Sequence, residues 1–380
     1  MCLNAYAQSN LDNVLLQIRA NNKSLQANVQ FWEAQKLQFK TSLTPNNPTV
    51  EYDFLSGSPA NAGNQHDFSI VQQFDFPTTY KNKSKLAIQQ TAQADFALNI
   101  SRQDILIEAK KYCIELVYHN KLQLHLAQQK QNTEIFYRDF QIKLEKGDGT
   151  ILDVNKAKLQ LIEINKEYQE NGSAITQLNQ KLTELNGGIE ISLFDTLYPI
   201  PPLIPDFKQL ESEYEIADPL RKNLEQQITI NQRQLDLSKS LRLPKLELGY
   251  HYQGILGQTY HGVHTGISLP IWENKNMVKQ KQAQLLFSEL QLNAHTNEHY
   301  YHIKHMYEEY SKLKITLQEY QSALKTINSI ELLNKAIKLG EISTIEYFME
   351  INYYNNAIKN YLQMENEYYQ IIAELFKYKL

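Results

Sequence analysis

Apolar and polar residues alternate along four short segments of the chain, and this alternation predicts β-strands. In the first segment, Val50, Tyr52 and Phe54 fall on one face of the predicted strand, while Glu51 and Asp53 fall on the other. Successive side chains of a strand point to opposite faces, so each strand has one apolar face and one polar face. The segments form two predicted hairpins, over residues 49–76 and 245–269.

After each hairpin the apolar residues recur three or four positions apart, which is typical of α-helices. Residues 81–143 contain no proline or glycine, so they predict a single helix about 95 Å long. A second long helix is predicted over residues 274–338, where the apolar side chains from Met306 to Ile327 keep the spacing of a coiled-coil seam. Shorter helices are predicted over residues 11–42, 153–186, 218–241 and 343–378.

The chain carries this order of elements twice. Pro77 and Pro270 end the two hairpins, and Gly147 and Gly340 mark glycine turns between helices; both pairs are 193 positions apart. A long internal repeat determines the architecture of a chain, so we interpret the sequence as two structural repeats. The repeats cover residues 9–200 and 201–380, and a glycine- and proline-rich linker ends the first.

Composition limits the partners. The 380 residues carry a net charge of −4, so nothing draws the chain to nucleic acid or to an anionic lipid surface. No stretch approaches the ~18 apolar residues of a membrane-spanning helix, so contact with a membrane would rely on the strands or on a lipid anchor. Two cysteines, Cys2 and Cys113, cannot supply a disulfide framework.

The first residues resemble a cleavage site. Ala5, Tyr6 and Ala7 precede Gln8 and match the A-x-A pattern at which secretory signal peptides are cut. We therefore interpret residues 1–8 as the remnant of a signal peptide whose basic and apolar regions lie upstream. The alternative is a polar terminal tail.

The predicted strands have the length and the two-faced pattern of strands that cross an outer membrane, where about 9–11 tilted residues span the bilayer. Four strands are too few to close a barrel, and open strand edges cannot face lipid. The pattern therefore predicts that several chains complete one barrel together. The aromatic residues that we assign to lipid contact and to the interfacial belts are Tyr52, Phe54, Phe68, Phe74, Phe76, Tyr250, Tyr252, Tyr260 and Trp272.

The order of elements resembles that of the TolC-like outer membrane factors of Gram-negative bacteria. The resemblance covers residues 9–380 and rests on FDFP at Phe74–Pro77, SLP at Ser268–Pro270 and the turns GDGTILDV and GEISTIEY. It implies a mainly α fold with a small β part, in which a homotrimer forms a twelve-stranded barrel continued by a coiled-coil α-helical tunnel. Within the family, the sequence is most similar to the heavy-metal-efflux branch.

The resemblance also implies a function without catalysis. The chain would be the outer membrane component of a tripartite efflux system, a passive duct that contacts outer membrane lipid and extends into the periplasm. Its partners would be a periplasmic adaptor and an inner-membrane pump of the resistance-nodulation-division type, and its substrates metal cations. Ducts for drugs or for type I secretion share the fold, and a structural coiled-coil stalk is the alternative from another class. No cofactor is expected.

The glycine turns are the first candidate site. A tight reversal between long helices needs residues that tolerate positive φ, which accounts for the glycines. The resemblance implies that these turns are the tunnel tips that dock the adaptor, and that Pro77 and Pro270 mark the junctions of strand and helix. The candidate docking residues are Gly147, Gly149, Thr150, Leu152, Gly340, Ser343 and Ile345.

Asp153 and Glu346 follow the two glycine turns at matching places. In a trimer they would form a ring of six carboxylates at the tunnel entrance, and such rings favour cations. The simpler interpretation is a capping charge at the start of a helix, which the helix dipole favours. The two roles are compatible.

Histidines are the remaining candidates. His295, His299 and His302 recur on one helix with His305, but a mixed helix face explains them without a metal. His295, Glu298 and His299 also match the H-x-x-E-H motif of zinc proteases, although a coiled coil offers no substrate cleft. His251 shares the polar face of a strand with Glu247, where a weak cation site competes with simple solvation. We predict no firm metal site and no enzyme.

Overall fold

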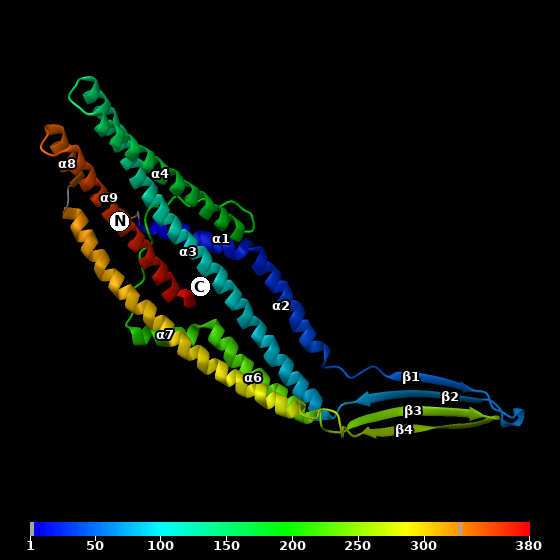
Figure 1. The fold of residues 1–380 in the computed structure, drawn as a ribbon. Helices are drawn as coiled ribbons and strands as arrows, with labels where there is room; N and C mark the ends of the chain where they lie inside the picture. Colours follow the sequence, from blue (N-terminus) through cyan, green and yellow to red (C-terminus); the bar gives the residue numbers. More distant parts are fainter. Residues whose placement is uncertain (1–3, 327–328) are drawn as a thin grey trace. The chain divides into compact units, whose positions relative to one another are not determined.

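The computed structural model describes residues 4–326 and 329–380, and the same order of elements occurs twice along the chain (Figure 1). The first copy consists of α1 (Asn4–Asn21), α2 (Lys23–Thr41), β1 (Thr49–Leu55), η1 (Ala60–Ala62), β2 (Gln65–Phe74), α3 (Pro77–Glu145) and α4 (Ile151–Leu185). The second consists of α5 (Phe207–Ala217), α6 (Pro219–Ser240), β3 (Lys245–Ile255), β4 (Gln258–Ser268), α7 (Met277–Thr326), α8 (Ser329–Leu339), α9 (Thr344–Leu375) and η2 (Lys377–Lys379). The predicted fold class, mainly α with a small β part, is confirmed.

The prediction of one helix over residues 11–42 is wrong, because the structure has two helices that meet at Asn22. The Asn22 side-chain oxygen accepts a hydrogen bond from the backbone N–H of Leu25 at 2.9 Å, which caps α2. Its amide group donates to the carbonyl oxygen of Leu185 at 2.7 Å. A polar residue inside an apparently helical pattern thus ends one helix and starts the next.

The second copy has a corresponding break, and sequence analysis missed the short helix α5 that precedes it. Asp218 caps α6, because its carboxylate accepts hydrogen bonds from the backbone N–H groups of Leu220 at 3.0 Å and Arg221 at 3.3 Å. Pro219 occupies the first turn of α6, where its missing N–H costs nothing. The predicted helix over residues 218–241 corresponds to α6 alone.

The helix predicted over residues 274–338 also needs correction. It begins three residues later, at Met277, because Asn274 and Asn276 adopt positive φ angles of 61° and 70° that a helix cannot contain. The remainder is described as α7 and α8. By contrast, α3 is one helix of 69 residues, and Pro77 is its first residue.

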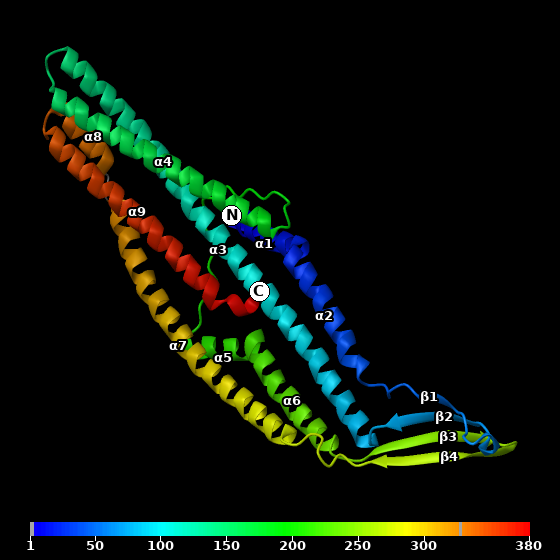
Figure 2. The same cartoon turned by 45° about the vertical axis from the view of Figure 1, so that its right-hand side comes forward.

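All four strands form a single antiparallel sheet in the order β1-β2-β3-β4, so the hairpins of the two copies pair through β2 and β3 (Figure 2). Tyr52, Phe68 and Tyr252 lie side by side across three strands, which confirms the predicted aromatic face. Tyr260 was assigned to this face incorrectly. It pairs with Gln253, on the polar face, because it lies three residues from Val263 in β4 and therefore on the opposite face of the strand.

The described residues divide into two compact units, and each unit contains parts of both copies. One unit holds the residues up to Ala27, Ser101–Ala217 and the residues from His299 onward. Its largest apolar core joins α1, α3 and α4, with Ile18, Leu116 and Leu182 almost fully buried. Within the described residues, no helix combines the length and the apolar character that crossing a membrane requires.

The other unit holds Asn28–Ile100 and Asp218–Glu298, that is, the sheet with α2, α6 and the adjoining parts of α3 and α7. Amide side chains join its helices. Gln226 of α6 donates to both the backbone and the side-chain oxygen of Gln89 on α3, at 2.8 and 2.9 Å. Near the sheet, Thr79 donates to the carbonyl oxygen of Ser240 at 3.3 Å.

Candidate functional site

The two glycine turns have the same backbone geometry. Gly147 has a φ of 79° and Gly340 a φ of 74°, conformations that side-chain-bearing residues seldom adopt. At each turn the glycine N–H bonds the carbonyl oxygen three residues earlier, and the next N–H bonds the carbonyl oxygen five residues earlier. This pair of hydrogen bonds is the Schellman arrangement, and it satisfies carbonyl groups that the end of the helix would leave open.

Thr150 and Ser343 cap the return helices. The Ser343 hydroxyl accepts the backbone N–H of Glu346 at 3.2 Å, and the Glu346 carboxylate accepts the backbone N–H of Ser343 at 2.8 Å. This is a capping box. Thr150 likewise accepts the N–H of Asp153 at 3.2 Å, and its hydroxyl donates to the Asp153 carboxylate at 2.7 Å. Both predicted acids therefore have a capping role in the chain itself.

Glu346 remains charged while it caps. The hydrogen bond from the Ser343 backbone N–H, together with that from the Ser343 hydroxyl, holds the pKa of the Glu346 carboxyl below its usual range. The carboxylate is exposed. Apolar side chains next to the two caps are exposed as well, with Leu152 at 66% and Ile345 at 55%. These residues occupy equivalent positions in the two copies.

The two turns lie at the same end of the helical hairpins α3/α4 and α8/α9, and the helices behind them pack against each other. A buried aromatic cluster lies behind them, where Phe136 of α3 meets Tyr347 of α9 with ring centroids 4.6 Å apart. Phe140 and Phe348 approach in the same way at 6.3 Å. The cluster also buries Val154, Ala157 and Ile337, so it joins the end of α3/α4 to the end of α8/α9.

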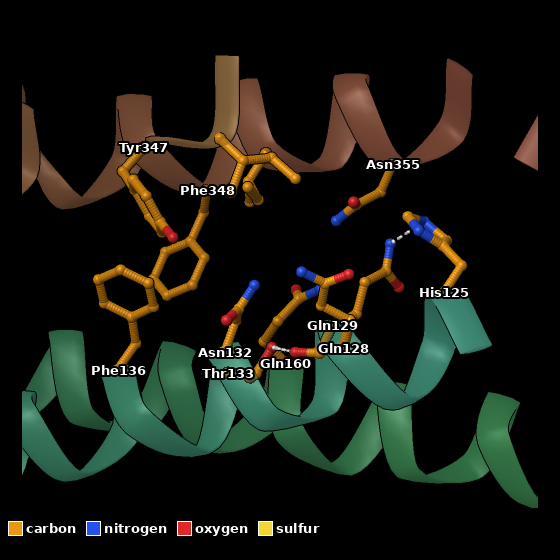
Figure 3. Close-up of a pocket in the computed structure, with 12 residues that line it drawn as sticks. His125, Gln128, Gln129, Asn132, Thr133, Phe136, Gln160, Tyr347, Phe348 and Asn355 are labelled. Carbon is orange, nitrogen blue, oxygen red and sulfur yellow. Dashed lines mark hydrogen bonds between the residues drawn. The ribbon is translucent and has the colours of Figure 1, made fainter. Parts of the chain in front are cut away.

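A pocket of about 50 Å³ lies beyond this cluster, between α3, α4, α8 and α9 (Figure 3). Amide side chains enter it from two directions: Gln129 and Asn132 rise from α3, and Asn355 comes from α9. His125 closes one end, and its Nε2 accepts a hydrogen bond from the Gln129 amide group at 2.8 Å. Burial, reinforced by the positive charge of Lys359, lowers the pKa of His125 to about 4.

Ion pairs continue the contact between the two helical hairpins. Lys121 of α3 bonds Glu365 of α9 at 2.5 Å, and Lys359 of α9 pairs with Glu167 of α4. The Lys121 ammonium group also lies 4.9 Å from the ring centre of Tyr198, which stacks on Tyr369. The linker between the two copies is thereby fixed to α3 and α9.

The polar face of the sheet is the second candidate site. Glu51, Asp53, Asp67, Glu247 and His251 share this face and line a hollow of about 600 Å³. His251 and Glu247 lie on the same face of β3, as expected from the alternation, and both line the hollow. The partners of Glu247 are Gln73, which donates to it at 3.1 Å, and His264 at 3.9 Å. The hairpin register supplies this neighbour, because it places β4 beside β3.

The helical histidines have separate surroundings. His295 lies 3.3 Å from the buried carboxylate of Asp218, His299 packs against the ring of Tyr214, and His302 is exposed. Among the described residues, no group of three or more His, Cys, Asp or Glu side chains is arranged to hold a metal ion. Cys2 lies outside the described residues. Cys113 is buried in the core of α3, where desolvation raises the pKa of its thiol to about 12.

Comparison with solved structures defines the class of fold. The crystal structure of CusC, which forms a transmembrane channel, superposes with a TM-score of 0.77 at 13% identity, over 97% of this chain and 92% of that chain. The CmeC outer membrane channel of Campylobacter jejuni gives 0.75 at 16% identity, over 97% and 85%. The outer membrane protein VceC of Vibrio cholerae gives 0.77 at 12% identity, over 99% and 96%.

The superpositions cover almost the whole of this chain, so it has the fold of these outer membrane channels. No model of a protein family and no curated protein sequence matches it. At 12–16% identity the likeness establishes the fold alone.

Proposed function

We propose that this protein is the outer membrane channel of a tripartite efflux system and acts as a passive exit duct. The observation that carries the proposal is the two-faced sheet at the end of long helices, in a fold that outer membrane channels share. One face presents Tyr52, Phe68 and Tyr252, and the other presents carboxylates and histidines around a hollow. A lipid-facing side and a water-facing side require this division.

The open edges of the sheet support assembly with further copies of the chain. Within residues 4–326 and 329–380, β1 and β4 each pair with only one strand, so their outer N–H and C=O groups need partners before they can lie in lipid. Pairing β4 of one copy with β1 of the next would satisfy both edges. We propose that three copies close a twelve-stranded barrel in this way, in the outer membrane, with the helices in the periplasm.

The glycine turns are the proposed docking site for a periplasmic adaptor, which connects the duct to an inner-membrane pump of the resistance-nodulation-division type. Exposed Leu152 and Ile345 beside two rigid caps support this role, because they offer equivalent apolar contacts from both copies. The proposed junctions of barrel and tunnel remain Pro77 and Pro270. The chain itself would perform no chemistry.

We propose metal cations as the substrate. Four carboxylates line the polar face of the sheet, and Asp153 and Glu346 would add six charges at the tunnel entrance of a trimer. Such surroundings favour cations over anions. Export of organic drugs or secretion of proteins through the same fold remains the alternative that the substrate test must distinguish.

Fractionation and a deletion strain test the proposal. The protein should appear in outer membranes as a detergent-stable trimer, whereas a structural stalk would appear as a rod without heat-resistant β-structure. Deletion of the gene should sensitise cells to monovalent or divalent metal cations but not to organic dyes. Sensitivity to dyes alone would replace the metal substrate and keep the duct. A water-soluble monomer would overturn the function as a whole.

A further inference from the structure

The pocket behind the glycine turns has walls that an apolar coiled coil would not provide. Its amide residues stand where apolar side chains normally fill the space between two helical hairpins (Figure 3). On one side the aromatic pair Phe136 and Tyr347 closes it, and on the other side the ion pair between Lys359 and Glu167 follows. The pocket is therefore a polar stretch of the contact between the two helical hairpins, with an aromatic pair on one side and an ion pair on the other.

The pocket contains a buried hydrogen-bond acceptor without a partner among the described residues. The side-chain oxygen of Asn355 is buried and has no hydrogen-bond partner within the described residues. Leaving a buried polar atom without a partner costs roughly 1–3 kcal/mol, so such atoms are usually bonded to ordered water. A water molecule needs at least ~10–15 Å³ of accessible space and two to four polar partners. A space of about 50 Å³ between Asn132, Gln129 and Asn355 meets both conditions.

Asn355 occupies a seam position of α9. Phe348, Ile351 and Asn355 follow each other at intervals of three and four residues, and Leu362 comes seven residues later, which is the spacing of a helix face buried against a partner. On α3 the facing positions are Gln129, Asn132 and Phe136, again three and four apart.

A polar residue at a seam position lowers stability but selects one register. Apolar seams that repeat every seven residues can pair after a slip of one heptad, whereas amides that share bound water lose their partners when the helices slip. This chain needs one selected register because of its internal repeat. Its two hairpins are copies with equal spacing from strand to turn, so a slip would leave one turn about 10 Å beyond the other.

We propose that the pocket is a binding site for ordered water and that the hydrated amides fix the register of the second hairpin against the first. Water bridges Asn355 of α9 to Asn132 and Gln129 of α3. This arrangement keeps the turns at Gly147 and Gly340 level with each other. The inference concerns the folded chain and does not depend on the proposed function.

The test combines a density map with distance measurements on the full-length protein. In the parent protein, a map that resolves ordered water elsewhere along the helices should show water within hydrogen-bonding distance of Asn355. Spin labels at Lys146 and Glu341, in a Cys2→Ser, Cys113→Ala background and diluted with unlabelled chains, should give one distance between the turns. Asn132→Leu with Asn355→Leu should raise the unfolding midpoint by several degrees and add a second distance shifted by about 10 Å.

Two further variants keep the test decisive. Asn355→Ser retains a polar group and room for water, so it should keep the single distance. Asn356→Leu makes the same change one residue away at an exposed position and should change neither the distance nor the midpoint. A dry pocket in the parent map would overturn the water site even if the leucine variants do not fold. A stabilised double-leucine variant with one unchanged distance would overturn the register role.

Discussion

Phe136 of α3 and Tyr347 of α9 lie in contact with ring centroids 4.6 Å apart, and this contact joins the two helical hairpins directly behind their glycine turns. Both side chains are almost fully buried, and the Tyr347 hydroxyl donates to the side-chain oxygen of Asn334 at 2.9 Å. The contact is not repeated between the copies: the position equivalent to Phe136 in the second copy is Ser329, and the position equivalent to Tyr347 in the first copy is Val154. The turns are held by their surroundings as well as by their own glycines.

Removing this contact should destabilise the end of the helices. Truncation of a buried Phe typically costs 3–5 kcal/mol, so we expect Phe136→Ala to lower stability by about this amount. Hydrogen exchange of the backbone N–H groups around residues 136–145 and 333–348 measures it locally. Ile135→Ala, at an exposed position of the same helix, should have little effect. Equal protection in the two variants would show that the aromatic cluster does not hold the turns.

The glycine turns should tolerate asparagine but not valine. A Cβ atom at Gly147 or Gly340 meets no other atom within 4 Å, so the cost of substitution comes from the positive φ alone. Asparagine adopts positive φ far more readily than a β-branched residue, for which the conformation costs at least ~1–2 kcal/mol at each turn. We expect Gly147→Val with Gly340→Val to abolish efflux while folded trimers remain in the membrane.

The corresponding asparagine variants should retain most of the efflux. Efflux is measured as survival of the deletion strain at increasing metal concentration, with trimer abundance as the control. Normal efflux in the valine variant would mean that the backbone geometry of the turns is irrelevant to docking. Loss of efflux in the asparagine variant would instead assign the effect to the added side chain.

The exposed acids beside the turns should set cation preference. Asp153→Asn with Glu346→Gln removes the charges, while the new amide oxygens can still accept the hydrogen bonds from the Thr150 hydroxyl and the Ser343 backbone N–H. The ratio of cation to anion permeability of reconstituted channels should fall, and stability should change little. Because hydrogen bonding holds the pKa of Glu346 low, the preference of the parent should persist in mildly acidic solution. Glu163→Gln with Glu350→Gln is the control, and an equal change in both variants would reject a localised ring.

Sequence predicted the turns well because their chemistry is local. Gly147 and Gly340 need positive φ, and Thr150 with Asp153 caps the next helix within four residues, so short-range spacing contains the information. The break at Asn22 was missed because a single Asn on a helix also suits a solvated face. In the structure its side chain caps α2 and also donates to the carbonyl oxygen of Leu185, which is distant in sequence.

The pocket and the aromatic cluster could not be predicted, because they depend on which helices pair. The sequence around Asn355 does not indicate that Asn132 faces it. The sequence around Phe136 predicts only a buried residue of a helix. Long-range pairing is the information that the local pattern lacked.

His125 should make stability depend on pH. Burial lowers its pKa to about 4 in the folded chain, from the ordinary value of 6.5, so below pH 6.5 the unfolded chain takes up a proton that the folded chain refuses. The stabilisation is fully present above pH 6.5 and is lost as pH falls toward 4. The shift corresponds to about 2 kcal/mol between pH 7.5 and pH 5. His125→Gln keeps an amide in the pocket and should remove this part of the pH dependence of thermal unfolding, whereas an unchanged slope would show that His125 is hydrated.

Adjacent residues of β3 should respond in opposite ways to the same charge. Tyr250 lies on the aromatic face of the sheet, paired with Ile70 and Val263, while His251 lies on the polar face beside the hollow. If the aromatic face contacts lipid, an arginine there costs about 2–4 kcal/mol near the bilayer midplane, whereas an arginine on the lumen face remains hydrated. We therefore expect Tyr250→Arg to reduce the amount of heat-resistant trimer in outer membranes severalfold, and His251→Arg to leave it near the parental level.

The two variants share one strand, one added charge and nearly the same side-chain size, so the comparison isolates the environment of each face. Equal loss in both would mean that the hollow is packed against protein, and equal tolerance would mean that neither face meets lipid.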